Sequence, residues 1–200
     1  MPPPANTPRH PRAFTLVELL SVIAIIGVLA AILIPVTASV RASGKQAACA
    51  SNLRQLHMGT MLYSQDNKNL LPALYHGTPW YTVLKDNYLS DPRAFFCPAA
   101  EHDPAFSANY IPYGYNFHIS GGVGVAPSVN RNQLLYPQSM ILIADSIDTA
   151  NQQYYIQRNG ASIRAGARHK GKIQLVHVDG SIALAEPDDL LDNRHWLPLR

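Results

Sequence analysis

The sequence predicts an α+β protein in which one long N-terminal helix is followed by a head with a small antiparallel sheet. Three observations favour this fold class: a continuous apolar run over Phe14–Val36, a helical periodicity that continues to about Asp66, and short strand-like segments after residue 138. The chain has 200 residues, 47% of them hydrophobic and 14% charged. This is enough for one folded domain with its own core and an accessory element.

The apolar run is long enough to cross a lipid bilayer. As a helix, its 23 residues would extend about 34 Å, against about 30 Å for a bilayer core. A buried helix of a soluble protein rarely stays apolar on all faces over that length. A cleavable secretory signal is the nearest alternative, because Thr37-Ala38-Ser39 offers small residues for a cut, but its apolar region usually has only about 7–15 residues.

Glu18 and Pro35 interrupt the apolar run and call for a physical reason. An ionised carboxylate costs about 2.5–3.5 kcal/mol near the centre of a membrane and less toward its edge. Glu18 either lies among the lipid headgroups or pairs with a cation, which a cut between Ala13 and Phe14 would supply as a new α-amine on a neighbouring copy. Pro35 lacks the N–H that would bond to the carbonyl of Ala31, which predicts a bend or a locally melted turn.

The helical pattern continues beyond the membrane-length run. One face of this second half carries Cys49, Leu53, Leu56, Thr60 and Tyr63, at spacings of three and four residues. Gln65-Asp66-Asn67, followed by Pro72, signals the end of the helix. We therefore expect the second half of the helix to pack this one face under the head.

The rest of the chain predicts loops, one short helix and a sheet. Residues 68–138 are rich in Pro, Tyr and Gly, with a short helix over Pro79–Tyr88, and the glycines of residues 121–124 indicate a turn rather than a nucleotide-binding loop. Asp179-Gly180 between two apolar arms predicts a two-residue hairpin turn with positive φ. The predicted strands are Ser139–Asp145, Tyr154–Gln157, Lys172–Val178 and Ser181–Glu186.

The segment Arg12-Ala13-Phe14-Thr15-Leu16-Val17-Glu18-Leu19-Leu20 resembles the processing site of type IV prepilins and type II secretion pseudopilins. The resemblance implies cleavage between Ala13 and Phe14 by a prepilin peptidase, N-methylation of Phe14, and a role in assembly for Glu18, the fifth residue after the cut. Pro35 occupies the position where members of this family commonly have a helix-bending proline. In the family the residue before the cut is usually Gly, whereas here it is Ala13.

A second resemblance covers the head. It is similar to a family of prepilin-like proteins with a C-terminal motif of His, nine residues and Asp-Gly, which is intact here from His169 to Asp179-Gly180. Earlier segments that carry the resemblance are Cys49–Leu56, Tyr63–Asn67, Phe96-Cys97-Pro98, Tyr113-Gly114-Tyr115-Asn116 and Ala144-Asp145-Ser146. This resemblance implies a pseudopilin-type fold linked to a secretion or pilus-like apparatus.

Together, the resemblances imply four parts: a prepilin leader at 1–13, a transmembrane and assembly helix at 14–36, an extracytoplasmic half of the helix at 37–67, and a globular pseudopilin-like head at 68–200. They imply a single-pass protein of the inner (cytoplasmic) membrane with its head outside the cytoplasm, later part of a periplasmic or surface filament. The expected partners are the peptidase, like subunits in a helical filament, the assembly machinery and the membrane. Nucleic acid is not expected, because the net charge of +3 falls to +1 when Arg9 and Arg12 leave with the leader.

Cys49 and Cys97 are the only cysteines. In an extracytoplasmic head they could form a disulfide, which would close a loop of about 47 residues and stabilise the fold by roughly 4 kcal/mol in the chain-entropy model. Two separately buried thiols are the alternative.

No cofactor is required by the sequence, but a divalent metal is conceivable at His169, His177, Asp179 and Asp145. Calcium prefers about 6–8 oxygen ligands, so zinc would suit the histidines better. The alternative is structural: Asp179 builds the hairpin turn, and His169 bonds to a loop or strand end.

The function that these features imply is structural, in a type II secretion pseudopilus or a type IV pilus-like filament. The sequence has no GxSxG, HExxH or P-loop motif, so we do not expect an enzyme. Two alternatives are a permanently anchored extracytoplasmic protein that binds polysaccharide through Tyr and Trp side chains, and a secreted hydrolase that depends on His169.

Overall fold

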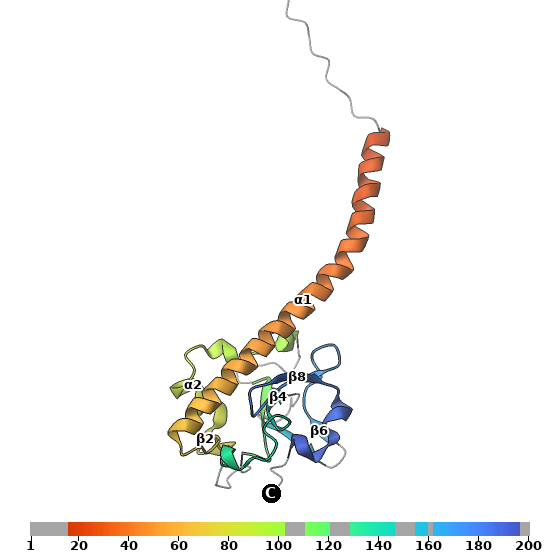
Figure 1. Cartoon of the computed structure of the whole chain (residues 1–200). Helices are drawn as coiled ribbons and strands as arrows, with labels where there is room; N and C mark the ends of the chain where they lie inside the picture. Colours follow the sequence, from red (N-terminus) through yellow and green to blue (C-terminus); the bar gives the residue numbers. More distant parts are fainter. Residues whose placement is uncertain (1–15, 103–110, 121–128, 147–154, 160–161, 197–200) are drawn as a thin grey trace, which may run out of the picture. The chain divides into compact units, whose positions relative to one another are not determined.

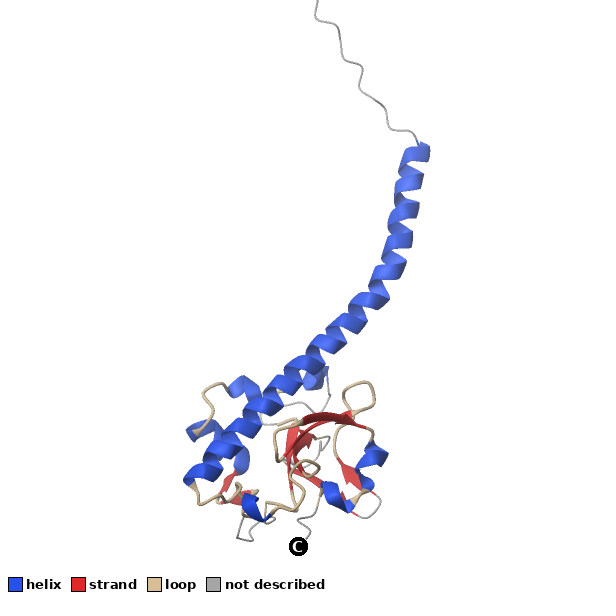
Figure 2. Ribbon diagram, viewed as in Figure 1, coloured by secondary structure: helices blue, strands red, loops and turns tan. Residues whose placement is uncertain are grey.

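The computed structural model describes residues 16–102, 111–120, 129–146, 155–159 and 162–196. It has a long helix, α1 (Leu16–Asp66), followed by a head that contains a sheet, short helices and ordered loops (Figures 1 and 2). The predicted α+β fold class is therefore confirmed. The chain divides into two compact units, Met1–Arg41 and Ala42–Arg200.

The first unit contains the apolar part of α1. Among the described residues, α1 is the one helix that is long and apolar enough to cross a membrane. The large apolar side chains from Leu16 to Val36 are all exposed in the single chain. The helix is continuous through Pro35, so the described helix has no melted turn there. The predicted cleavage residues, Ala13 and Phe14, lie outside the described residues.

In the second unit, the remainder of α1 contributes one face to the core. The predicted stripe is confirmed for Cys49, Leu53, Leu56 and Thr60, which are buried, while Tyr63 is only partly buried. Helix α2 (Trp80–Asn87) matches the predicted short helix and buries Trp80 and Leu84. The other short helices are the 3₁₀ segments Pro92–Phe95, Pro98–His102, Arg131–Gln133, Pro187–Leu191 and Asn193–His195.

The head is built on a six-stranded sheet in the order β6-β5-β3-β4-β7-β8. Its strands are β3 (Tyr113–Asn116), β4 (Ile141–Asp145), β5 (Tyr155–Asn159), β6 (Ser162–Arg164), β7 (Ile173–His177) and β8 (Ile182–Ala185). A separate two-stranded ribbon joins β1 (Tyr75–His76) to β2 (Thr78–Pro79) through Gly77. Strands β4, β5, β7 and β8 correspond to the four predicted strands, whereas β3 and β6 were not predicted.

The main sheet is mixed, and it differs from the predicted small antiparallel sheet by one parallel strand pair. Strand β3 pairs antiparallel with β4 on one side and parallel with β5 on the other. Strand β5 follows β4 along the chain but lies on the other side of β3, and it runs in the same direction as β3 and opposite to β4. The other strand pairs of this sheet are antiparallel.

Both faces of the sheet are covered. On one face, Val176 of β7 packs in the larger core cluster, with Leu53 and Leu56 of α1. On the other face, Leu175 packs in a second cluster with Leu190 and Trp196 from the C-terminal segment. This arrangement buries β7 on both sides, so neither face of the strand is left to solvent.

Candidate functional site: a disulfide beside a buried ionic cluster

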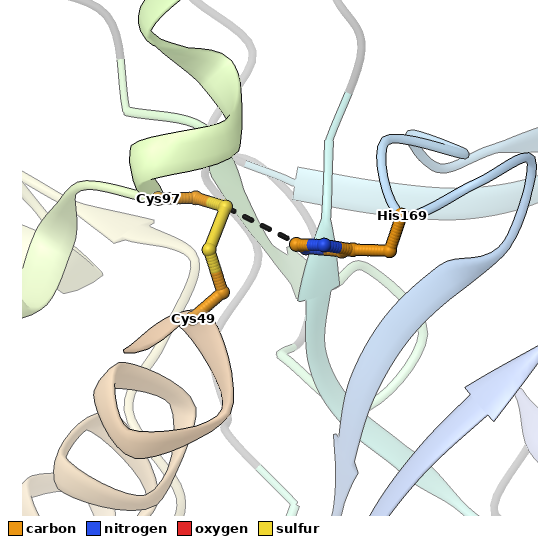
Figure 3. A group of neighbouring side chains, drawn as sticks. All are labelled: Cys49, Cys97 and His169. Carbon is orange, nitrogen blue, oxygen red and sulfur yellow. Dashed lines mark hydrogen bonds between the residues drawn. A yellow bond between two sulfur atoms is a disulfide. The ribbon is translucent and has the colours of Figure 1, made fainter. Parts of the chain in front are cut away.

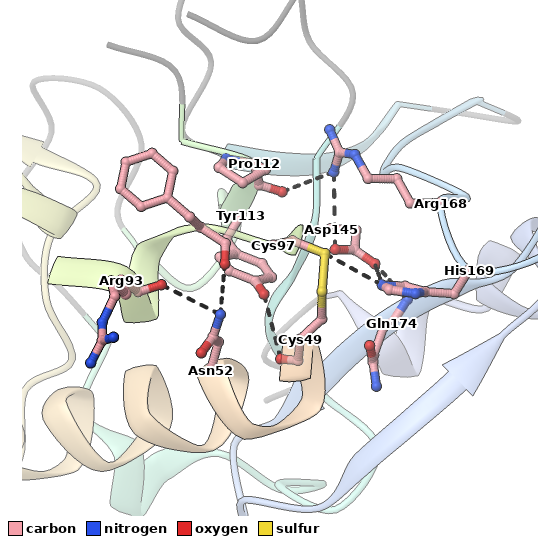
Figure 4. The surroundings of a disulfide bond; sticks show 11 residues. Cys49, Asn52, Arg93, Cys97, Pro112, Tyr113, Asp145, Arg168, His169 and Gln174 are labelled. Atoms are coloured by element: carbon pink, nitrogen blue, oxygen red, sulfur yellow. Dashed lines mark hydrogen bonds and ion pairs between the residues drawn. A yellow bond between two sulfur atoms is a disulfide. The ribbon is translucent and has the colours of Figure 1, made fainter. Parts of the chain in front are cut away.

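Cys49 and Cys97 form a disulfide between α1 and the segment that joins two 3₁₀ helices. The sulfur atoms are 2.10 Å apart and the Cα atoms 5.0 Å apart, and both residues are buried. One turn after Cys49, the Asn52 side-chain amide donates to the Phe96 carbonyl at 2.6 Å. The Tyr113 hydroxyl donates to the Cys49 carbonyl at 3.4 Å (Figure 4). Of the two alternatives that the sequence left open, the structure contains the bridge, reinforced on both sides by hydrogen bonds.

His169 lies directly against the disulfide (Figure 3). Its Nε2 atom is 3.6 Å from the Cys97 sulfur. A tight turn fixes this position, because the backbones of His169 and Lys172 exchange two hydrogen bonds of 3.1 Å. The two residues inside the turn, Lys170 and Gly171, have φ values of 56° and 82°. Positive φ at both central positions defines the turn type that best joins two twisted antiparallel arms.

Asp145, the last residue of β4, lies beside His169 and close to the disulfide (Figure 4). Its Oδ2 atom is 3.4 Å from His169 Nε2 and accepts a hydrogen bond of 3.0 Å from the Gln174 backbone. Its Oδ1 atom is 4.0 Å from Nη1 of Arg168, which also donates to the Pro112 carbonyl at 3.0 Å. A carboxylate, an imidazole and a guanidinium are thus gathered beside the bridge, and all three side chains are almost fully buried.

Burial controls the protonation of this cluster. It raises the pKa of Asp145 to about 7, because the opposing effects of the Arg168 charge and the Gln174 N–H offset only part of the desolvation. Burial also lowers the pKa of His169, and the nearby Arg168 charge acts in the same direction. At neutral pH the cluster therefore contains a neutral imidazole beside a carboxyl group near its midpoint, with Arg168 as the permanent cation.

The arrangement gives no positive evidence of catalysis. A nucleophilic triad needs a base that bonds to the nucleophile through one ring nitrogen and is oriented through the other. Here the same atom of His169, Nε2, faces both the Cys97 sulfur and the Asp145 carboxylate. The sulfur is also covalently bonded to Cys49 and has no proton to give.

The structure divides the four predicted metal ligands into two pairs. Asp145 and His169 are together, whereas His177 and Asp179 lie at the other end of β7. There the Asp179 carboxylate accepts from the Ser181 N–H at 2.8 Å and from its hydroxyl at 2.7 Å, and His177 Nδ1 is 2.9 Å from the same hydroxyl oxygen. The Asp145 carboxylate accepts a hydrogen bond from the backbone N–H of Gln174, which precedes His177 by three residues. Three residues of a strand extend about 10 Å. One ion therefore cannot contact all four residues, and Asp179 has the turn-building role that was the alternative.

The hairpin turn also explains its glycine. Gly180 has a φ of 91°, and a Cβ atom there would lie 2.9 Å from the His57 ring of α1. His57 Nε2 is 3.0 Å from the Val178 carbonyl, which fixes the ring over the turn. The sequence predicted no site role for His57, Arg168 or Gln174. Their positions follow from tertiary packing, and only the basic segment around His169 could have drawn attention to Arg168.

Comparison with known proteins bears on the N-terminal part of the chain. The family model described as the prokaryotic N-terminal methylation motif matches residues 8–34. This motif is typical of type IV prepilins and pseudopilins, so the chain has a prepilin-type N-terminus that continues into a transmembrane-type helix. No curated protein and no solved structure matches the chain. The match supports a pilin- or pseudopilin-like protein and does not extend to the His169–Gly180 segment, whose family resemblance stays a prediction.

Proposed function

We propose that this chain is a structural subunit of a type II secretion pseudopilus or a type IV pilus-like filament. The observation that carries the proposal is the methylation motif at residues 8–34, which continues into the apolar part of α1. Every large apolar side chain from Leu16 to Val36 is exposed in the single chain. An apolar surface of this extent needs lipid or other protein chains to cover it. A subunit that first lies in the membrane and then packs among copies of itself meets this need at both stages.

In this proposal a prepilin peptidase cuts between Ala13 and Phe14 and the new N-terminus is methylated. The α-amine of one subunit then pairs with Glu18 of a neighbour. Burying a carboxylate in a bundle of apolar helices is costly unless a cation meets it, so the pair favours one register between subunits. The four parts of the chain are those predicted from the sequence, with the head outside the cytoplasm.

The head fits an extracytoplasmic location because disulfides persist in oxidising compartments. The Cys49–Cys97 bridge joins the helix to the head segment that lies over it. The alternative of a polysaccharide-binding protein gains no support from the tryptophans, although two of the described tyrosines, Tyr75 and Tyr136, are exposed. Trp80 and Trp196 are the only tryptophans, and both are fully buried, as are Tyr113 and Tyr115. They form the core of the head and are unavailable as a stacking platform.

Mass spectrometry of the chain isolated from its native membrane tests the processing step. The proposal expects a polypeptide that begins at Phe14 and carries one added methyl group. A native chain that begins at Met1 without modification, or at any residue after Thr37, would contradict it.

A Glu18→Ala variant tests assembly. We expect it to be cut and to stay in the membrane, but to be absent from sheared filaments, because the amine of its neighbour has lost its partner. Ser21→Ala is the matched control, since the Ser21 hydroxyl donates only to the Glu18 carbonyl one turn earlier in the same helix. Filaments that incorporate both variants equally would overturn the assembly role of Glu18.

A further inference from the structure

We propose that the head, when its disulfide is reduced, binds Zn²⁺ between Cys49, Cys97, His169 and Asp145. The two sulfur atoms and a ring nitrogen of His169 lie within 4.8 Å of one another, and all three residues are buried. The Asp145 carboxylate is next to the same imidazole, with Oδ2 3.4 Å from Nε2 (Figure 4). Two thiolates, an imidazole and a carboxylate form a ligand set that zinc accepts. This set shares two residues with the one that the sequence suggested and replaces His177 and Asp179 by the cysteines.

The spacing of the ligand atoms matches a tetrahedral zinc site. With zinc bonds of about 2.3 Å to sulfur, 2.05 Å to nitrogen and 2.1 Å to oxygen, the tetrahedral edges are about 3.6 Å from sulfur to nitrogen and about 3.4 Å from nitrogen to oxygen. In the structure, the Cys97 sulfur is 3.6 Å from His169 Nε2, and Nε2 is 3.4 Å from Asp145 Oδ2. Two edges of the polyhedron are therefore present before any metal binds. The Cys49 sulfur would complete the site by moving to about 3.8 Å from the Cys97 sulfur, the sulfur–sulfur edge of the same polyhedron.

The local charges balance when zinc is bound. Two thiolates and one carboxylate around Zn²⁺ have a sum of −1, and the guanidinium of Arg168, 4.0 Å from Asp145 Oδ1, brings the sum to zero. A neutral total matters because an uncompensated charge at this depth would be strongly unfavourable. The Gln174 N–H donates to the same Oδ2 atom and holds the carboxylate in place, as outer-shell hydrogen bonds do for metal ligands.

The redox step is a reduction by two electrons. A dithiol gives two electrons and two protons to the disulfide and becomes a disulfide itself, which leaves Cys49 and Cys97 as thiols. Zn²⁺ then displaces the two thiol protons and forms two zinc–sulfur bonds. Oxidation removes two electrons, restores the sulfur–sulfur bond and releases the metal. In both states α1 stays joined to the segment that contains Cys97, once by a covalent bond and once through an ion.

Cobalt(II) provides a spectroscopic test on the full chain in detergent. The chain is reduced with a phosphine, which becomes the phosphine oxide by taking an oxygen from water, and is then titrated with Co²⁺. We expect one Co²⁺ per reduced chain, with thiolate-to-cobalt charge-transfer absorption and the intense d–d bands of tetrahedral cobalt, and loss of both when Zn²⁺ is added. The oxidised chain should show neither.

Variants separate this site from nonspecific binding. His169→Ala should weaken Co²⁺ binding by a factor of about ten or more, since substitutions of supporting residues alone cost metal sites about 10–100-fold. His177→Ala is the matched control and should bind as the unaltered chain does. If reduction unfolds the metal-free head, Zn²⁺ should restore the fluorescence of the buried tryptophans in the unaltered chain and fail to do so in His169→Ala.

Three results would overturn the proposal: a reduced chain without thiolate–cobalt absorption, a His169→Ala variant with unchanged affinity, or a reduced and unfolded head that zinc does not restore. The proposed filament role is independent of all three, because it depends on the N-terminal motif and on Glu18 rather than on this cluster.

Discussion

Replacement of both cysteines by alanine should remove about 4 kcal/mol from the free energy of unfolding of the head. The bridge joins residues separated by 48 positions in the sequence. In the chain-entropy model, a loop of this length restricts the unfolded chain by about 13 to 14 cal/mol/K, or about 4 kcal/mol at 25 °C. For a domain of this size, each kcal/mol corresponds to about 2–4 °C in Tm, so we expect Tm to fall by about 8–16 °C. Alanine is preferable to serine, because a serine hydroxyl at these buried positions would add a polar group that needs a partner.

Tryptophan fluorescence can follow this unfolding in the full chain. The two tryptophans, Trp80 and Trp196, are fully buried and belong to different core clusters on the two faces of the sheet. Urea denaturation in detergent, monitored by their emission, therefore reports on the whole head and not on the membrane-type part of α1. The change in midpoint at constant slope gives the difference in stability.

Two comparisons separate the covalent bond from its surroundings. The unaltered chain, reduced by a phosphine in the presence of a chelator, should unfold with the stability of the double alanine variant, because both lack the crosslink and any metal. Asn52→Ala removes the amide that bonds to the Phe96 carbonyl but keeps the bridge, and it should cost about 1 kcal/mol. If the double variant and the reduced chain both lie within about 1 kcal/mol of the oxidised chain, the unfolded ensemble already holds these segments together and the entropic account is wrong.

Three further substitutions, with Gly44→Ala as the control for one of them, test other parts of the head by the same denaturation assay. Asp145→Asn should abolish one pH dependence of stability. Folding raises the pKa of this carboxyl from 3.8 to about 7, so the contribution of the carboxyl to stability falls as the pH rises from about 4 to 7. In that range, the stability of the unaltered chain relative to the variant should fall by up to roughly 1.4 kcal/mol per pH unit. An unchanged difference between pH 5 and pH 8 would contradict this. Gly114→Ala would place a Cβ atom 2.6 Å from the backbone of Tyr155 in the parallel β3–β5 pair, and it should lower the stability of the head by about 3 kcal/mol or more. Gly44→Ala in α1 places a Cβ atom that meets nothing within 4 Å, and it should stabilise the helix by up to about 1 kcal/mol. Equal effects of these two substitutions would refute the close approach of β3 and β5. Asn116→Ala should cost about 2–3 kcal/mol, because its buried amide donates to the Ile141 carbonyl at 2.8 Å and its oxygen accepts from the His118 N–H at 3.0 Å. A loss below 1 kcal/mol would show that water replaces the amide.

The features that the sequence predicted correctly all depend on local pattern. The long helix follows from an apolar run of membrane length, and its buried stripe follows from the 3.6-residue period at Cys49, Leu53, Leu56 and Thr60. The position of the β7–β8 hairpin follows from Asp179-Gly180 between two apolar arms, and Gly180 has a positive φ. The predicted two-residue turn was wrong: His177 pairs with Ser181, so the loop has three residues, Val178, Asp179 and Gly180. In each case a few neighbouring residues decide the conformation, so no knowledge of the tertiary structure is needed.

Strand β3 was missed because its sequence, Tyr113-Gly114-Tyr115-Asn116, is short and half of it is Gly and Asn, which are depleted in strands. All four residues are buried, and the strand lies between β5 and β4 inside the sheet. Its glycine is needed because the β5 backbone comes too close for a Cβ atom. These requirements come from strands more than twenty residues away in the sequence, and the mixed character of the sheet has the same origin.

The candidate site was predictable in its members but not in its grouping. Asp145 and His169 were predicted as members of one metal-ligand set and the two cysteines as a possible disulfide, and the structure places these two groups side by side. What the sequence could not show is which residues would separate: His177 and Asp179 are close to His169 along the chain, yet an extended strand carries them away from it. Neither could it show that Arg168 turns inward, because an arginine in a basic segment is usually solvated.

The spacing of His169 and Asp179-Gly180 has a physical explanation in the hairpin arm between them. The nine intervening residues complete one turn at Lys170-Gly171, form strand β7 and lead into the second turn. Each end contacts a different element: His169 faces the disulfide and Asp145, while Gly180 packs under His57 of α1. One residue more or fewer would turn every side chain of β7 to the opposite face and exchange the two core clusters that meet there. In this chain, the spacing from His169 to Asp179-Gly180 therefore sets the length of a strand that is held at both ends. This explains the positions of the histidine and of Asp-Gly without placing them in one common site.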